Sequence, residues 1–463
     1  MHSQRHEDTK GVKMTMALEP KGRSEKSHMT ATEMHGVIAN LRRRGADAFA
    51  KQGWPTTKME EWRDTNLSAI ATGKFAPATS DGGAAAVELA KRYAFGAEAA
   101  VELVFINGRF DKALSNLGQL GNAGEVLALN AALEKHPALL EKHLGAYADV
   151  NLHPLAALST SHVTDGAVVV INKGATVAKP IHLLFLSVAE DTTATAPRVL
   201  VIAGENSESS VVETYAGVDG KRYHTNAVTE IYAEKHARID HNKLQQEGNA
   251  AYHTALMQVN LSEHATFISH STSIGSKLTR NDLAVFFGGE YAEATLNGLV
   301  LAGGDQHIDN HTLLHHEKAN CPSHELYKHV LDGNSTAVFK GKIFVQKDAQ
   351  KTDSKQTSKS LLLTDTAYMN SQPALEIYAD DVKCTHGSTT GPIDENAVFY
   401  LVSRGVSLAQ ARHLMTYAFA ADITRRIKVA PVRARIEDFM AAQHGLPQDL
   451  RITEEARYDV KLL

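Results

Sequence analysis

Three short stretches of the chain share one pattern. Residues 234–239 read Glu-Lys-His-Ala-Arg-Ile, residues 263–267 read Glu-His-Ala-Thr-Phe, and residues 290–296 read Glu-Tyr-Ala-Glu-Ala-Thr-Leu. Each time an alanine follows an acidic residue, and these alanines, Ala237, Ala265 and Ala292, recur at almost equal intervals. A unit of this length is too short to fold alone, but stacked units bury one another's apolar faces. The spacing therefore predicts a solenoid.

The sequence on both sides of these stretches has the same texture. From residue 163 to about residue 390, short β-rich runs such as residues 168–171 (Val-Val-Val-Ile) alternate with Gly, Asn and Asp turns. A weaker repeat places Ala337 and Ala367 at a similar interval. The runs are too irregular in length for a four-stranded propeller blade. We therefore predict a mainly β protein whose core, residues 161–392, is a right-handed parallel β-helix.

Helical patterns flank this core. Residues 30–160 are predicted to form a mostly helical N-terminal domain, with one short strand at 102–106 that meets an Asn-Gly turn. Residues 393–463 are predicted to form a small C-terminal helical domain, in which Ser407-Leu-Ala-Gln410 has the form of a capping box. The polar residues 1–29 contain no apolar core for secretion and are predicted to be a disordered tail.

Composition limits the classes of function. The 463 residues are 43% apolar and 22% charged, with a net charge of −5, as expected of a soluble folded protein without a strong surface field. Nucleic acid and membrane are therefore not expected as partners. Two cysteines indicate a reducing compartment, and no apolar run is long enough to span a membrane. We expect a cytoplasmic location.

One of the two cysteines lies close to a histidine. Cys384 and His386 stand at positions i and i+2 of an extended run, so their side chains should share one face of a strand. A thiol with an imidazole suits iron, and Lys383 with a protonated His386 would favour the reactive thiolate. A buried structural thiol beside a surface histidine is the alternative that the residues alone leave open.

Longer segments carry a resemblance. Residues 378–387 read Tyr-Ala-Asp-Asp-Val-Lys-Cys-Thr-His-Gly, and residues 399–405 read Phe-Tyr-Leu-Val-Ser-Arg-Gly. Together with residues 58–67, 323–328 and 332–342, they resemble the SufB/SufD family, scaffold subunits of the Suf iron–sulfur cluster assembly machinery. The resemblance is strongest from about residue 160 to about residue 430. With only two cysteines, the chain resembles the SufD branch more than the SufB branch, which generally carries more.

The resemblance implies a non-catalytic scaffold with two kinds of partner. A SufB-like paralogue would pair with the end of the β-helix, and a SufC-like ATPase would dock on the C-terminal helices. The docking residues predicted are Leu408, Leu414, Met415, Phe419 and Ile423. No phosphate-binding G-x-x-x-x-G-K-[ST] loop is present, so nucleotide binding is assigned to the ATPase. A homodimer in the absence of partners is a further expectation.

The resemblance also gives Cys384 and His386 a role. They would lie at a shared interface, where they bind or transfer iron, sulfur or a transient iron–sulfur cluster. A cluster typically needs about four protein ligands, so the partner chain would supply the others. Whether His386 ligates iron or assists transfer stays open, as does the electron donor.

Three rival hypotheses remain. The nearest is that the chain acts as the SufB-like scaffold subunit. The residues His315, His316, Cys321 and His324 have spacings compatible with a metal site, which would suit a stand-alone metal-binding β-helix protein. Polar ladders between coils explain such rows equally well, and Cys321 beside a proline is expected to be structural. The third rival is a pure interaction module in which the Cys-x-His pair is idle.

Overall fold

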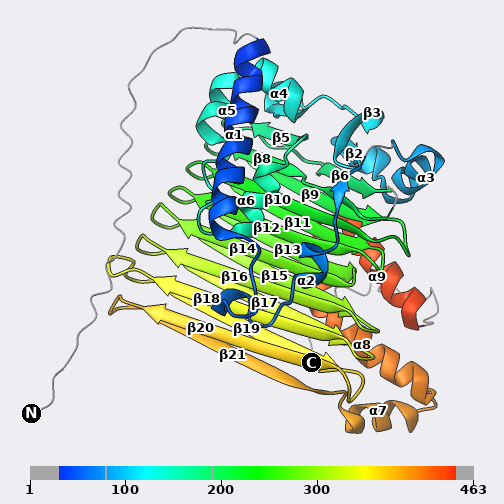
Figure 1. Ribbon diagram of the computed structural model, residues 1–463. Helices are drawn as coiled ribbons and strands as arrows, with labels where there is room; N and C mark the ends of the chain where they lie inside the picture. Colours follow the sequence, from blue (N-terminus) through cyan, green and yellow to red (C-terminus); the bar gives the residue numbers. More distant parts are fainter. Residues whose placement is uncertain (1–30, 79–80, 189–190, 445–463) are drawn as a thin grey trace, which may run out of the picture.

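The computed structural model describes residues 31–78, 81–188 and 191–444, and β-strands dominate it (Figure 1). From β9 (Glu208–Gly217) onward, successive strands alternate between two sheets, and each strand pairs in parallel with the strand two places further along. The chain therefore coils as a parallel β-solenoid, which confirms the predicted class. The predicted tail, residues 1–29, lies outside the described residues.

The strands form two sheets, sheet A and sheet B. Sheet A runs in the order β4 (Gly124–Ala128), β5 (Gly166–Ile171), β8 (Arg198–Ala203), β10 (Tyr223–Ala233), β12 (Tyr252–Leu261), β14 (Leu278–Phe287), β16 (His307–His316), β18 (Thr336–Val345) and β20 (Tyr368–Ile377), with β1 (Ala76–Pro77) and β7 (Thr193–Thr195) beside it. Sheet B runs in the order β3 (Arg109–Asn116), β2 (Val101–Ile106), β6 (Ile181–Ser187), β9 (Glu208–Gly217), β11 (Arg238–Glu247), β13 (Thr266–Gly275), β15 (Glu293–Ala302), β17 (Pro322–Leu331), β19 (Asp353–Leu362) and β21 (Lys383–Pro392).

The repeated alanines mark one turn of each coil. Arg238, Thr266 and Glu293 are register partners, so the alanines before them occupy equivalent positions, and all three are fully buried. The residues before the alanines, His236 and His264 among them, have φ close to 59°, the left-handed region. The two histidine rings stack, with centroids 4.6 Å apart. A small buried residue and a left-handed turn therefore explain the repeat.

The prediction that Ala337 and Ala367 occupy equivalent positions in successive coils is wrong. Thr336 pairs with Tyr368, so Ala337 lies opposite Met369 and not opposite Ala367. Residue type alone could not show this offset in register.

The two ends of the solenoid differ. At the N-terminal end, antiparallel strands close both sheets, β3 beside β2 and β4 beside β5. At the other end, β20 pairs only with β18, and β21 pairs only with β19, among the strands that the structure describes. Each of these final strands spans 10 residues and keeps one edge without a described strand partner. The solenoid is thus open at the end where Cys384 lies.

Helices lie at the N-terminal end and along the flanks (Figure 1). They are α1 (Ala31–Gln52), α2 (Ser68–Ala71), α3 (Gly83–Tyr93), α4 (Leu129–Lys135), α5 (Pro137–His143), α6 (Pro154–Ser161), α7 (Glu395–Val402), α8 (Leu408–Thr424) and α9 (Ala430–His444), with short 3-10 turns at Glu60–Trp62, Gly96–Glu98 and Gly121–Ala123. The predicted capping box at Ser407 is confirmed, because the Ser407 hydroxyl accepts a hydrogen bond from the backbone N–H of Gln410. Among the helices described, none has the length and apolar content to cross a bilayer.

Candidate functional site

Cys384 and His386 lie on the last strand of the solenoid. Cys384 pairs with Ser354 and His386 with Gln356, and both partners are buried in the interior between the sheets. Side chains in register on parallel strands share a face, so the thiol and the imidazole also point inward. No further coil of the described chain covers them, and the thiol is half-buried while His386 is exposed. The predicted common face is therefore confirmed, at the open end of the core.

The environment of the thiol departs from the prediction. Burial raises the pKa of Cys384, and the carboxylate of Asp353 raises it further. The prediction that Lys383 and His386 hold this thiol as a thiolate is therefore wrong for the isolated chain. Lys383 is the adjacent residue on the strand, so its side chain points to the opposite face.

Buried polar rows lead along the core to both residues. Ser323, Ser354 and Cys384 are successive register partners, and the two serine hydroxyls lie 2.6 Å apart. Ser323 Oγ also lies 3.0 Å from Nε2 of the buried His316. The predicted pair therefore lies at the exposed end of a longer row of polar side chains that runs along the core. Sequence reasoning missed this row, although its members recur at the length of one coil.

The second row ends at His386. Glu325, Gln356 and His386 are successive register partners, and Gln356 Nε2 donates to Glu325 Oε2 over 2.7 Å. Burial raises the pKa of Glu325 to about 7. Gly341, on the opposite sheet, leaves room for the amide, since a Cβ there would lie 2.1 Å from Gln356 Nε2.

The histidine-rich segment does not form a metal site. Successive residues of β16 face opposite sides, so His316 points into the core while His315 lies outside, between Phe286 and Phe344. His324 is exposed on β17 of the other sheet. Over the described ranges, no three His, Cys, Asp or Glu side chains are placed to hold a metal ion. The alternative hypothesis, that the residues of this segment form a metal site, is therefore wrong.

Cys321 is fully buried, as expected of a thiol with a structural role. It occupies the buried position that Ala292 fills one coil earlier, directly after Asn320 in the left-handed region. Its thiol donates to the carbonyl oxygens of Gly289 (3.3 Å) and Ala319 (3.4 Å). Burial raises its pKa to about 11, so it stays a thiol at neutral pH.

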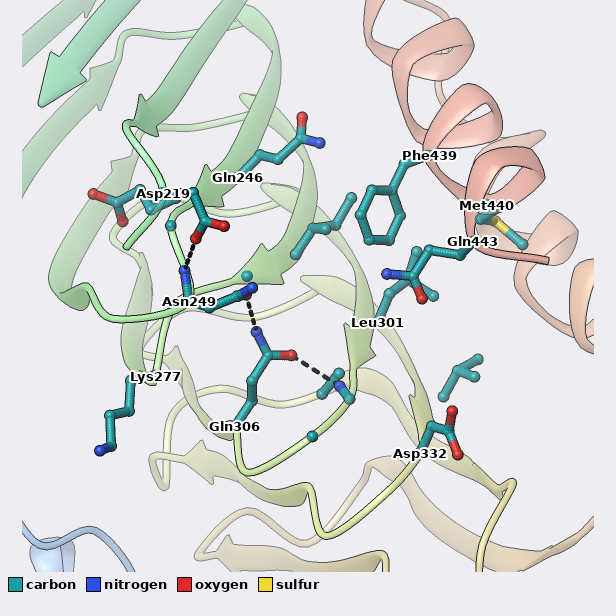
Figure 2. Close-up of a pocket in the computed structure, with 18 of the residues that line it drawn as sticks. Asp219, Gln246, Asn249, Lys277, Leu301, Gln306, Asp332, Phe439, Met440 and Gln443 are labelled. Carbon is teal, nitrogen blue, oxygen red and sulfur yellow. Dashed lines mark hydrogen bonds between the residues drawn. The ribbon is translucent and has the colours of Figure 1, made fainter. Parts of the chain in front are cut away.

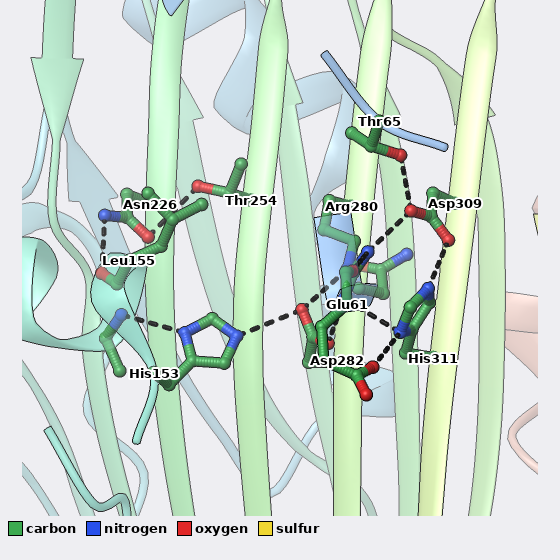
Figure 3. A network of polar contacts seen from close by, with 12 residues as sticks. Glu61, Thr65, His153, Leu155, Asn226, Thr254, Arg280, Asp282, Asp309 and His311 are labelled. Carbon is green, nitrogen blue, oxygen red and sulfur yellow. Dashed lines mark hydrogen bonds and ion pairs between the residues drawn. The ribbon is translucent and has the colours of Figure 1, made fainter. Parts of the chain in front are cut away.

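A charged network fastens the N-terminal segment to the outer face of sheet A (Figure 3). Arg280 binds Asp282 through two nitrogens, at 2.8 and 2.9 Å, and Asp309 at 2.6 Å. Its guanidinium also donates to the Glu61 carbonyl at 3.0 Å, and Thr65 donates to Asp309. The network contains no thiol.

A hollow of about 790 Å³ lies between α9 and the turns of sheet B (Figure 2). Its floor is polar, with Gln306 donating to Asn249 at 3.3 Å, and Phe439 of α9 forms an apolar wall. Among the described residues that line it there is no cysteine or histidine, so this hollow is separate from the thiol.

The C-terminal helices use much of their apolar surface internally. Ile423 is 1% exposed and packs with Val212, Leu244 and Leu299 on the outer face of sheet B. Because sheet B of the same chain already covers Ile423, the prediction that it contacts a docked partner is wrong. Leu414, Met415 and Phe419 are half-buried, and Leu408 is 57% exposed. Sequence reasoning missed two more exposed apolar residues, which are on α7: Phe399 at 72% and Tyr400 at 56%.

Comparison with known proteins gives this arrangement a context. Residues 185–419 match the model of the SufBD core domain of the SUF system for FeS cluster assembly, and residues 23–183 match that of the SufBD N-terminal region. The chain belongs to the SufBD family. It is 32% identical to the iron–sulfur cluster assembly protein SufD of Escherichia coli, over 82% of this chain and 86% of that one. It is 30% identical to a SufBD family protein of Synechocystis, over 90% of this chain and 94% of that protein.

Membership of the SufBD family agrees with the expected scaffold role. SufBD proteins are subunits of iron–sulfur cluster assembly, so this chain is a component of that system. The donor atoms at the open end, one sulfur and one nitrogen, are of the types that iron accepts. Two such donors are fewer than the roughly four protein ligands that an iron–sulfur cluster needs.

Proposed function

We propose that this chain is a non-catalytic scaffold subunit on which an iron–sulfur cluster is built at an interface with a second scaffold chain. The observation that carries the proposal is the position of Cys384 and His386 on the last, uncovered strand of the core. Two ligands on an open end are an incomplete site. A second chain docked there would complete the ligand set and exclude water.

The free edges of β20 and β21 support a strand-pairing partner. Each strand spans 10 residues and has one edge whose backbone N–H and C=O groups face no described strand. Exposed edges of this length are usually protected in soluble proteins, because they pair with other chains. A SufB-like paralogue whose own β-helix ends in matching strands would continue both sheets. Homodimerisation through the same edges is the alternative when that paralogue is absent.

The second partner proposed is a SufC-like ATPase on the C-terminal helices. The residues proposed for it are the exposed Phe399, Tyr400 and Leu408 at the start of this region, in place of the buried Ile423. ATP binding and hydrolysis would belong to the ATPase. Movement of that subunit would strain the scaffold interface and open Cys384 to incoming iron or sulfur.

Native mass spectrometry tests the assembly. The chain is co-expressed with the SufB-like and SufC-like proteins of its own organism, and the intact complex is weighed. One copy of this chain with one paralogue and two ATPases is the expected result. A lone chain carrying stoichiometric metal would contradict the scaffold role, and a homodimer would show that the free edges pair without the paralogue.

Reconstitution tests the site. Cys384→Ala should leave the complex assembled but lower the yield of iron–sulfur cluster, followed by its visible absorbance. Cys321→Ala is the matched control, because that thiol is buried in a turn away from the open end. An unchanged cluster yield in Cys384→Ala would show that the Cys-x-His pair is not needed for cluster assembly. It would favour a pure interaction module.

A further inference from the structure

A second cavity lies apart from the site already described. It encloses about 230 Å³ between the outer face of sheet A and the segment that contains α2 and β1. The turn between β2 and β3, the C-terminal end of α6 and β7 complete its walls. Cys384 and His386 are not among the described residues that line it. We name it the aromatic cavity, after Trp54 and Phe75 in its wall.

Much of the lining of the aromatic cavity is apolar. Trp54, Phe75 and Leu158 contribute two aromatic rings and a branched side chain. The Phe75 ring lies edge-on to the imidazole of His224, with the ring centroids 6.0 Å apart. A cavity of about 150 Å³ lined by apolar side chains already accepts benzene in another protein. The aromatic cavity therefore has room for one aromatic ring with a small substituent at each end.

His224 offers an unsatisfied acceptor to this cavity. The residue is 3% exposed, and its Nε2 lies 2.8 Å from Oγ1 of Thr254. The amide of Asn226 donates to the Leu155 carbonyl at 2.9 Å, and its Oδ1 accepts the only hydroxyl proton of Thr254 at 3.0 Å (Figure 3). Thr254 must therefore accept from Nε2–H of His224.

The other ring nitrogen of His224 is left with a lone pair. Burial lowers the pKa of the imidazole to about 3, so the ring is neutral and Nδ1 carries no proton. Nδ1 has no hydrogen-bond partner among the described residues, and it is not enclosed by protein atoms, so it is open to the cavity that His224 lines. A ligand with an O–H or N–H group would satisfy it.

The titratable residues of the lining are all basic. Lys74, Arg109 and His162 line the cavity and are exposed, so they form a rim on its solvent side, whereas His224 is buried. None of the described lining residues is Asp or Glu. A cavity with a basic rim and no carboxylate attracts an anion and repels a cation.

We propose that the aromatic cavity binds a small aromatic carboxylate with a hydroxyl or N–H group on the far side of its ring. The ring would occupy the apolar part, the hydroxyl or N–H would donate to Nδ1 of His224, and the carboxylate would lie at the rim beside Arg109. A few polar groups placed around an apolar pocket fix the orientation of a ligand in this way. The site goes beyond the proposed scaffold function and does not depend on it.

Three probes separate the parts of this ligand: 4-hydroxybenzoate, benzoate and phenol. Ligand-observed NMR titration of the full chain at neutral pH gives the Kd of each. Benzoate lacks the donor and should bind about three- to tenfold more weakly than 4-hydroxybenzoate, the effect of one net hydrogen bond. Phenol keeps the donor but lacks the carboxylate, and it should bind about threefold more weakly.

Two pairs of variants locate the binding. Arg109→Gln should weaken binding of 4-hydroxybenzoate about threefold and leave phenol unchanged. Lys112→Gln is its matched control, because Lys112 is exposed on the same strand and does not line the cavity. Ala71→Leu fills the cavity from the end of α2 and should abolish binding of all three probes. Ala69→Leu, exposed on the same helix and outside the lining, should bind them normally.

Four results would overturn the proposal. The first is the absence of binding by all three probes, and the second is binding that Ala71→Leu leaves unchanged. Equal affinity for 4-hydroxybenzoate and benzoate would show that His224 does not meet the ligand. Equal affinity for 4-hydroxybenzoate and phenol would show that the basic rim does not bind the carboxylate.

Discussion

The guanidinium of Arg280 lies 4.4 Å from the centre of the Trp62 ring, although the two residues are far apart in the sequence. This contact brings the N-terminal segment onto the outer face of sheet A. Beneath the ring, the same guanidinium neutralises Asp282 and Asp309, both of which are largely removed from water. One cation therefore joins the N-terminal segment to two successive coils of the solenoid, and its removal should affect all three.

Arg280→Met should lower the free energy of unfolding by about 3–5 kcal/mol, because it leaves two largely buried carboxylates without their cation. Urea denaturation monitored by circular dichroism measures the change. Arg63→Met is the control, since the guanidinium of Arg63 forms an ion pair with Glu60 at the surface and its loss should cost less than about 1 kcal/mol. Equal stability of the two variants would show that the Arg280 cluster does not fasten the segment.

Stability should fall in acid through the same cluster. Burial alone would raise the pKa of Asp282 and Asp309, but the charge of Arg280 and its hydrogen bonds hold both below their ordinary values. Their contribution to stability is present above the unfolded-state pKa of about 4 and is lost progressively as the pH falls from there toward their much lower folded-state pKa values. Denaturation midpoints between about pH 6 and about pH 3 should therefore decline. The decline should be shallower in Arg280→Met, and identical slopes would contradict this assignment.

Much of the fold follows from periodicity. The spacing of Ala237, Ala265 and Ala292 predicts the coil length correctly, because a small residue is needed under each left-handed turn. The i and i+2 relation of Cys384 and His386 likewise predicts their common face. Such rules hold because the position of a residue along its own strand or turn decides which way its side chain points.

Contacts between coils could not be predicted in the same way. The offset of Ala367, the amide of Gln356 and the bond from Arg280 to Asp309 all depend on strand register. Register was not known from the sequence. The burial of Ile423 was missed for a related reason: a helical face predicts what is apolar, but not whether a sheet of the same chain already covers it.

The two thiols should differ in reactivity. Cys384 is half-buried at the open end and Cys321 is fully buried, so iodoacetamide should label only Cys384 in the native chain. Because burial raises the pKa of Cys384, the midpoint of its rate profile should lie above about 8.5, the ordinary value for cysteine. Peptide mapping across neutral and alkaline pH measures both rates. Native labelling of Cys321 at a similar rate would contradict the burial assigned here.

The C-terminal helices allow a docking surface to be separated from a folding core. Phe399→Glu and Leu408→Glu change exposed side chains, so stability should hardly change while co-purification of the SufC-like ATPase is lost. Ile423→Ala should instead lower the free energy of unfolding by about 2–5 kcal/mol, since it leaves a cavity against sheet B. Below its unfolding temperature, that variant should still bind the ATPase. If it fails to bind while folded, and Phe399→Glu binds normally, the docking surface lies around Ile423 of α8 and not at Phe399 of α7.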